Sequence, residues 1–238
     1  SSVLDPITEE RTARGVRRQV TSLLLVAATL LAVAGTLAWY RLFPGPGYVF
    51  RDTQPNSSLP IGFNPCSPVE YVVYAVHAPP GTEGVIGSAI EEISAASGLE
   101  FVYRGPAQNP LIREPSPDGS VHEPVVIGWA RPQDVERFEE RSAGLGGSRH
   151  AWNASRGEFE YVTGVAVINT AAAEDMLERV DGRKYVRAVV MHELGHVLGL
   201  DHVDDRDQLM YHDNVGTTEL GDGDREGLAA LGAGRCDD

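Results

Sequence analysis

Cysteine is nearly absent from the sequence: the 238 residues include only Cys66 and Cys236. Two thiolates are too few for a zinc site built from four cysteines. In an oxidising compartment the two residues could form a disulfide that closes almost the whole C-terminal part of the chain into one loop, worth about 5 kcal/mol at best. The alternative is a pair of unrelated free thiols, and both interpretations stay open.

Basic residues are scarce after the first 41 positions. Residues 1–41 carry five arginines against three acidic residues, a net charge of +2, whereas the rest of the chain carries 15 basic and 31 acidic side chains, a net charge of −16. A segment this acidic repels the phosphates of nucleic acids and of anionic lipid headgroups at long range. We therefore expect no nucleic-acid partner.

Long apolar runs are also few, and the longest is Val20–Trp39, which holds no charged residue over 20 positions. As an α-helix, a run of this length spans about 30 Å, the thickness of the hydrocarbon core of a bilayer. Four arginines lie closely before the run and two after it, so the positive-inside rule places residues 1–19 in the cytoplasm. We predict a single-pass transmembrane anchor over residues 20–41 in the cell membrane, with the rest of the chain outside the cytoplasm.

A cleaved signal peptide is the alternative for this segment, because Ala32-Val33-Ala34 fits the small-x-small pattern of a cleavage site. The mature protein would then be secreted. Both interpretations export the remainder of the chain, and export is the condition that a Cys66–Cys236 disulfide requires.

Residues 42–68 hold six prolines and three glycines with little periodicity, which is typical of a linker. We therefore predict a linker over residues 42–65 and one domain over residues 66–238. In that domain, hydrophobic periodicity alternates between strand and helix patterns, and Asp224 is the expected N-cap of the last helix. The predicted strands cover residues 69–76, 99–105, 124–130 and 159–170, and the predicted helices cover residues 84–98, 172–180, 184–198 and 225–231. This order indicates a mixed α/β (α+β) domain.

Three histidines and a glutamate crowd into the otherwise apolar stretch VVMHELGHVLGLDH, residues 189–202. His192 and His196 are four residues apart, so on a helix both imidazoles project from one face and can reach a single zinc ion at about 2 Å. Glu193 lies next to the first ligand and can reach a water molecule beside the metal, where it would act as a general base.

A third ligand follows six residues later. Gly199 stands where the helix must end, and glycine tolerates the backbone conformation that turns the chain back. His202 comes three residues after it and can approach the same ion. Residues 192–202 therefore read H-E-x-x-H-x-x-G-x-x-H, a strong zinc-peptidase signal.

This segment resembles the metzincin zinc metallopeptidases, whose extended histidine motif is followed by a methionine-containing turn under the metal. Here DQLMY follows, which makes Met210 the candidate for that turn. The chain is most similar to a bacterial matrixin-type catalytic domain, strongly over residues 189–211 and loosely over residues 66–238. It departs from that pattern at Val203 and His212, where matrixins usually have serine and proline, and the departure at His212 affects the outer wall of the specificity pocket.

The resemblance implies a zincin-like fold: a twisted, mixed and mostly parallel sheet, an active-site helix and a small C-terminal subdomain after Gly199. A peptide or protein substrate would lie between them as an extended strand along a sheet edge, which we assign to part of Gly164–Ile168. The implied cofactor is a catalytic Zn²⁺. A structural Ca²⁺ held by the acidic runs 204–207 and 222–226 is a further expectation, against solvated loop charge as the alternative. We expect a monomeric ectodomain.

Two functions stay open at this point. The first is a zinc-dependent endopeptidase that cuts extracytoplasmic proteins with a metal-activated water and Glu193 as general base. The second is a non-catalytic, zinc-containing surface module that only binds partners. Structural zinc sites use four protein ligands and leave no open position, whereas the motif offers three histidines and an uncommitted glutamate. The composition of the motif therefore favours the enzyme.

Overall fold

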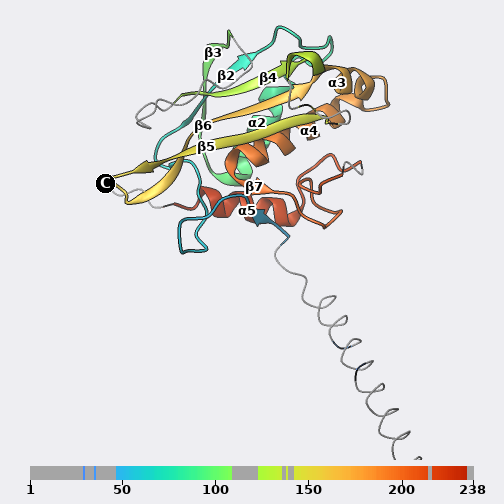
Figure 1. The fold of residues 1–238 in the computed structure, drawn as a ribbon. Coiled ribbons are helices and arrows are strands. Elements are labelled where there is room, and N and C mark those ends of the chain that lie inside the picture. Colours follow the sequence, from blue (N-terminus) through green and yellow to red (C-terminus); the bar gives the residue numbers. More distant parts are fainter. Residues whose placement is uncertain are drawn as a thin grey trace, which may run out of the picture. The chain divides into compact units, whose positions relative to one another are not determined.

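The computed structural model describes residues 47–108, 123–135, 138, 142–213 and 216–234, together with Thr29 and Gly35 (Figure 1). The predicted anchor therefore lies outside the described residues except at those two positions, and Cys236 lies outside them as well. Among the described residues, none of the helices combines the length and the apolar character needed to cross a bilayer. The anchor and the Cys66–Cys236 pairing stay predictions.

A five-stranded mixed sheet forms the centre of the domain, in the order β3-β2-β4-β6-β5. Its strands are β2 (Val69–Tyr74), β3 (Phe101–Pro106), β4 (Val125–Ala130), β5 (Gly144–Asn153) and β6 (Glu158–Asn169). Strands β3, β2, β4 and β6 are parallel to one another, and β5 runs antiparallel to β6. The predicted strands are thus confirmed with small shifts at their ends, and the sheet is mixed and mostly parallel, as expected.

The assignment of the sheet edge to Gly164–Ile168 is wrong. These residues lie in β6, which pairs with β4 on one side and with β5 on the other. Among the described strands, the sheet ends at β3 on one side and at β5 on the other, and the sequence pattern does not reveal β5. Its sequence GLGGSRHAWN contains three glycines in its first four residues, and glycine neither favours strands nor contributes to apolar alternation.

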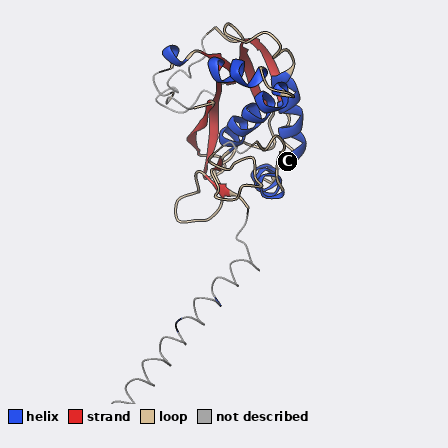
Figure 2. Ribbon diagram, turned by 90° about the vertical axis from the view of Figure 1, so that its right-hand side faces the viewer, coloured by secondary structure: helices blue, strands red, loops and turns tan. Residues whose placement is uncertain are grey.

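The described residues form four α-helices, and Figure 2 shows helices packed next to the strands. They are α2 (Val85–Ser97), α3 (Thr170–Leu177), α4 (Gly182–Leu198) and α5 (Asp222–Gly232). All four match predicted helices. Their ends differ from the prediction by one to three residues. For example, α3 begins earlier because the Asn169 side chain accepts hydrogen bonds from the N–H groups of Ala171 and Ala172, and α5 is capped by Gly221 and not by Asp224.

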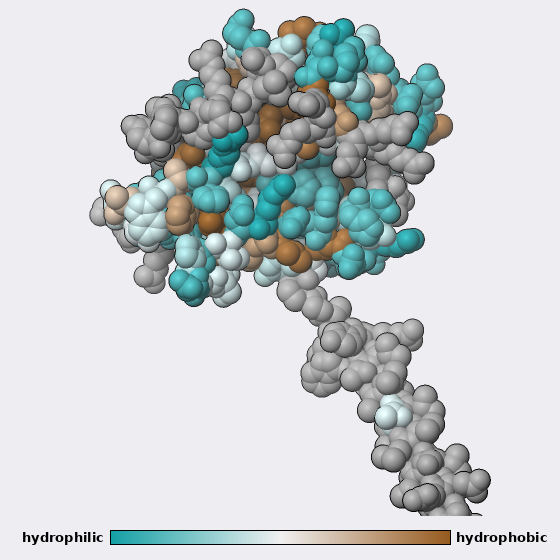
Figure 3. Space-filling view, viewed as in Figure 1, coloured by the Kyte–Doolittle hydropathy of each residue, from teal (hydrophilic) through white to brown (hydrophobic). Residues whose placement is uncertain are grey.

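Helix α4 is the central helix of the domain, because it packs against α2, β5 and β6. Of its 17 residues, 12 are buried, so apolar side chains surround it and hold its position. The fold fits a zincin-like architecture. On the face shown in Figure 3, hydrophilic side chains cover most of the described surface and apolar residues form small separate patches, as expected from the acidic composition.

The segment predicted as a linker packs onto the domain from Gly47 onward. Strand β1 (Val49–Phe50) pairs antiparallel with β7 (Leu200–Asp201), directly after α4. Ile61 is buried, and Phe63 packs against the Tyr161 ring. Residues 47–65 therefore belong to the same compact unit as the rest of the domain.

Candidate metal and catalytic centre

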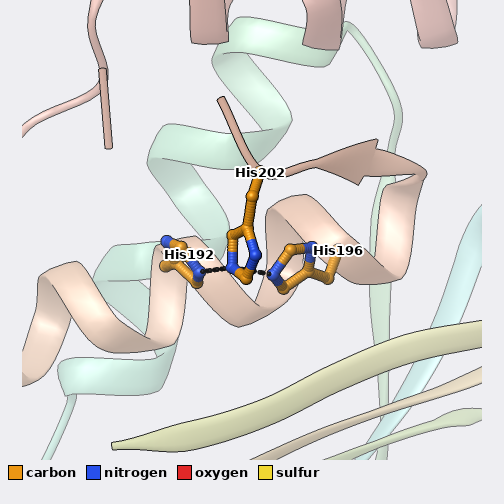
Figure 4. A group of neighbouring side chains, drawn as sticks. All are labelled: His192, His196 and His202. Atoms are coloured by element: carbon orange, nitrogen blue, oxygen red, sulfur yellow. Dashed lines mark hydrogen bonds between the residues drawn. The ribbon is translucent and has the colours of Figure 1, made fainter. Parts of the chain in front are cut away.

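Three imidazoles converge at the end of α4 (Figure 4). His192 and His196 project from one face of α4, and His202 follows β7 and points back at them. The Nε2 atom of His202 lies 3.2 Å from Nε2 of His192 and 3.1 Å from Nε2 of His196. The motif spacing thus brings together the three side chains that we predicted as zinc ligands.

Backbone carbonyls determine the tautomers of the two helical histidines. Nδ1 of His192 lies 2.7 Å from the Leu209 carbonyl oxygen, and Nδ1 of His196 lies 2.8 Å from the Leu200 carbonyl oxygen. Because a carbonyl oxygen only accepts, each Nδ1 carries the proton, and each Nε2 presents a lone pair to the centre. The three Nε2 atoms therefore lie close together with at most one proton between them, which would come from His202. A bound cation would stabilise this arrangement of lone pairs.

The dimensions fit zinc. Tetrahedral Zn²⁺ with Zn–N distances of about 2.0–2.1 Å separates its ligand nitrogens by about 3.3 Å, close to the two distances seen here. Burial lowers the pKa of His192 to about 4 and that of His196 to about 3, so both stay neutral at physiological pH, as ligation requires. Among the described residues, the three histidines are the one group of possible metal-binding side chains that converges in this way.

Glu193 is buried beneath β5. A Cβ atom on Gly144 would lie 2.6 Å from Glu193 Oε1, and one on Gly146 would lie 2.3 Å from the Glu193 carbonyl oxygen. Only glycine permits this approach between strand and helix. Burial raises the pKa of Glu193 to about 8, against a smaller opposing effect of the Arg51 charge. A carboxylate with this proton affinity is a stronger base than an exposed glutamate.

Gly199 turns the chain from α4 back to the centre. Helix α4 ends at Leu198, and the N–H of Gly199 donates to the Gly195 carbonyl at 3.0 Å with φ at 120°. A Cβ there would lie 3.1 Å from the Ile61 carbonyl oxygen and from the Tyr161 ring. The position therefore requires glycine both for its conformation and for the space around it.

Met210 lies under α4. It is buried, and its sulfur would be 2.6 Å from a Cβ on Gly195, so the side chain packs directly on the helix backbone between the two histidines. The Met210 carbonyl accepts a hydrogen bond from Val203 N–H at 3.0 Å. The predicted methionine turn thus contacts both the helix and the segment that carries His202.

Asp224 is a residue of the centre that the sequence did not reveal. It is fully buried, and its carboxylate accepts hydrogen bonds from the N–H groups of Leu209, Met210 and Gly221. It therefore holds the methionine turn in place from α5. Because Asp224 lies in the acidic run 222–226, its sequence context suggested a helix cap, loop charge or a calcium ligand, and no local signal indicated a buried anchor.

The acidic runs give no support for calcium. The Asp224 oxygens face N–H donors, and Asp204, Asp205 and Asp207 are exposed. The Asp205 carboxylate accepts hydrogen bonds from its own loop, from the Asp207 N–H and the Gln208 side chain. Calcium binding stays a prediction.

A cavity of about 420 Å³ opens beside His192 and Glu193. Its walls combine apolar side chains from α4 and the methionine turn with polar ones. They include Ala143, Gly144, Val189, Leu209, Tyr211, His212 and Thr217. His212, at which the sequence departs from the usual matrixin proline, lies in this wall and is 46% exposed. The cavity is large enough for one substrate side chain next to the centre.

Three convergent imidazoles that could hold one metal ion, a buried carboxylate and an adjacent cavity thus lie together at the end of α4. Residues 134–232 match the family model described as Matrixin. This segment begins ten residues before β5, ends with α5, and contains all three histidines, Glu193, Met210 and Asp224. Over these residues the chain is similar to the matrixin metallopeptidases. No curated protein matches the chain.

Proposed function

We propose that this protein is a zinc-dependent endopeptidase that hydrolyses extracytoplasmic protein substrates. His192, His196 and His202 would hold the metal, and Glu193 would act as the general base. The observation that carries this proposal is the triangle of Nε2 lone pairs directly beside a buried carboxyl group. When bound, zinc supplies a Lewis acid that lowers the pKa of a coordinated water to about 7 and polarises a carbonyl group.

Glu193 performs the proton transfers in this proposal. Its carboxylate takes a proton from the attacking water as the bond to the scissile carbonyl carbon forms. The protonated Glu193 then donates that proton to the amide nitrogen as the C–N bond breaks, so the carboxylate is regenerated. Gly144 and Gly146 cover this side chain and exclude bulk water from it.

The open edge of β5 would bind the substrate backbone. Asn169 N–H donates to the Ala143 carbonyl at 2.9 Å, so by antiparallel alternation the polar groups of Leu145 and Gly147 face β6. The backbone N–H and C=O groups of Gly144 and Gly146 therefore point away from β6, toward the open edge. Both glycines lie above Glu193. An extended peptide that adds to this edge places its backbone over the centre and one side chain in the cavity.

We also propose that the domain acts outside the cytoplasm, anchored by residues 20–41 or secreted after cleavage. The charge-free run Val20–Trp39 and the arginines before it support export. Alkaline carbonate extraction of membranes and N-terminal sequencing of the mature chain distinguish an anchored from a cleaved protein. A chain found only in the cytoplasm would contradict both.

The decisive experiment combines metal content with peptide cleavage. We expect the purified protein to bind one Zn²⁺, to cut a peptide library and to lose activity with a chelator. Glu193→Ala should keep the zinc and lower kcat about 10²- to 10⁴-fold. A matched control is Glu174→Ala, which changes an exposed glutamate on α3. Zinc bound by four protein ligands, with no cleavage, would support the alternative of a binding module.

A further inference from the structure

Arg51 reaches the substrate edge of the domain from the segment before it. Its Nη1 donates to the Gly146 carbonyl oxygen at 3.1 Å, and a Cβ on Gly147 would lie 3.5 Å from the same nitrogen. The Gly146 carbonyl is one of the groups that face the open edge of β5. The guanidinium therefore lies where a substrate backbone would run.

The backbone of Arg51 is held firmly. Its N–H donates to the Gly199 carbonyl at 2.8 Å, and the Asp52 carboxylate accepts a hydrogen bond from the Tyr161 hydroxyl at 2.9 Å. Gln54 exchanges two hydrogen bonds with the Phe159 backbone, at 2.7 and 2.9 Å. Arg51 is thus a fixed part of the cleft, unlike an arginine on a free tail.

The charge of Arg51 is available to a ligand. The side chain is exposed, and one of its five N–H donors is used by Gly146. In the described ranges, no carboxylate lies within ion-pair distance of it. An arginine with uncommitted donors binds a carboxylate in a planar, two-point contact.

Arg51 and the cavity lie on opposite sides of the centre. The cavity includes Ala143 and Gly144 at the start of β5, whereas Arg51 lies at Gly146 and Gly147. Strand residues rise about 3.3 Å each, so the two points are about 10 Å apart along the edge. Because Glu193 lies beneath this interval, a peptide bond above it has the cavity on one side and Arg51 on the other.

We propose that Arg51 determines substrate specificity by binding an acidic side chain of the substrate, on the side of the scissile bond away from the cavity. This inference rests on the proposed peptidase function. The net negative charge of the domain opposes acidic peptides only weakly, because charges more than about 8 Å away are screened at physiological ionic strength. The direct guanidinium–carboxylate contact is the stronger effect.

The test is a series of peptides with one cleavage site, in which Gln, Glu or Lys stands at each of three positions on either side of the scissile bond. A parallel series with apolar residues next to the bond identifies the side that enters the cavity. The full chain, in mild detergent, is compared with Arg51→Gln, Arg51→Glu and Arg179→Gln. Arg179 is exposed at the α3–α4 turn, so its variant removes the same charge from a different element.

We expect the wild type to favour Glu over Gln about fivefold in kcat/KM at one position on the side away from the cavity. Arg51→Gln should abolish this ratio, Arg51→Glu should shift the preference to Lys, and Arg179→Gln should keep it. Added salt should weaken the preference. Zinc content and thermal unfolding verify that each variant is folded. If Arg51→Glu is unstable, the comparison of wild type with Arg51→Gln is sufficient to test the proposal.

Two results would overturn the inference while leaving the peptidase intact. One is a Glu-to-Gln ratio that Arg51→Gln does not change. The other is an equal rise in kcat/KM for all peptides in Arg51→Gln, which would mean that the guanidinium merely shields the strand edge. Failure of the proposed function is distinct from both, because then neither wild type nor variants cleave any peptide.

Discussion

Single glycines determine how closely strand and helix approach at the centre. A methyl group on Gly146 would lie 2.3 Å from the Glu193 carbonyl oxygen, a backbone atom that cannot rotate away. We therefore expect Gly146→Ala to displace Glu193 and to lower kcat/KM about 10- to 100-fold, measured on the best library peptide. Gly87→Ala adds the same methyl group on α2 with no atom within 4 Å and should keep wild-type activity. Equal activity of the two variants would contradict this role of Gly146.

The raised pKa of Glu193 predicts a pH-dependent stability difference in the metal-free protein. A group whose pKa rises from 4.5 to about 8 on folding stabilises the fold below pH 4.5 and loses that contribution as pH rises through 8. Wild type should therefore become less stable relative to Glu193→Gln between pH 5 and pH 8.5, by on the order of 4 kcal/mol. Thermal unfolding in chelator measures it.

The difference in stability between wild type and Glu193→Gln reports on the titration of Glu193 alone, because the buried histidines titrate in both proteins. Glu174→Gln, an exposed change on α3, should follow the wild-type curve at every pH. Parallel curves for wild type and Glu193→Gln would show that the carboxyl group titrates normally.

Residue roles could be predicted where the spacing along the chain determines them. Two histidines four residues apart, a glutamate between them and a third histidine after a glycine specify one site through helix geometry alone. Asp224 and Arg51 could not be found in this way. Their roles depend on contacts with Met210 and Gly146, which lie far away in the sequence and become neighbours only in the folded domain.

At the scale of elements, α5 supports the metal centre through the methionine turn. Asp224 binds the Leu209 N–H, and the Leu209 carbonyl in turn accepts the Nδ1 proton of His192. In Asp224→Asn, an amide group faces backbone N–H donors, which should cost about 1–3 kcal/mol of stability. We also expect weaker zinc binding, because the turn that orients His192 loosens. Competition with a chromophoric chelator measures this affinity.

Asp222→Asn is the matched control, since Asp222 is exposed in the first turn of the same helix. Its zinc affinity should equal that of the wild type. If Asp224→Asn bound zinc equally well, the turn would not depend on α5.

Elements could be predicted where their pattern is strong. The apolar residues of α2 recur at helical spacing between Gly84 and Gly98, and both boundaries follow from the positive φ of these glycines. Strand β5 escaped prediction because its glycines are required by Glu193 and not by the sheet. The two-residue strands β1 and β7 are too short to show any periodicity.

At the scale of the whole molecule, the segment before Cys66 connects parts of the domain that are far apart in the sequence: α5, β7 and β6. Tyr48 lies against Gly227 of α5, Phe50 pairs with Leu200 after the active-site helix, and Gln54 binds β6. Composition alone suggested a linker here, because prolines and glycines are abundant both in free linkers and in irregular segments that pack tightly. Only the buried contacts distinguish the two.

Two truncated chains would show which interpretation holds. A chain that begins at Gly47 keeps β1, Arg51 and the buried Ile61, whereas one that begins at Cys66 loses them. Because burial of each large apolar side chain contributes about 1.5–3 kcal/mol, the shorter chain should be less stable by at least about 3 kcal/mol, and its melting temperature should fall by about 10 °C. Calorimetry with zinc bound measures the difference, and the longer chain serves as the control.

Since Arg51 N–H and Ile61 both contact Gly199, the loss of residues 47–65 should also loosen the turn that carries His202 and lower zinc affinity. Equal melting temperatures and equal affinities would mean that the contacts of residues 47–65 support neither the stability of the domain nor the metal site.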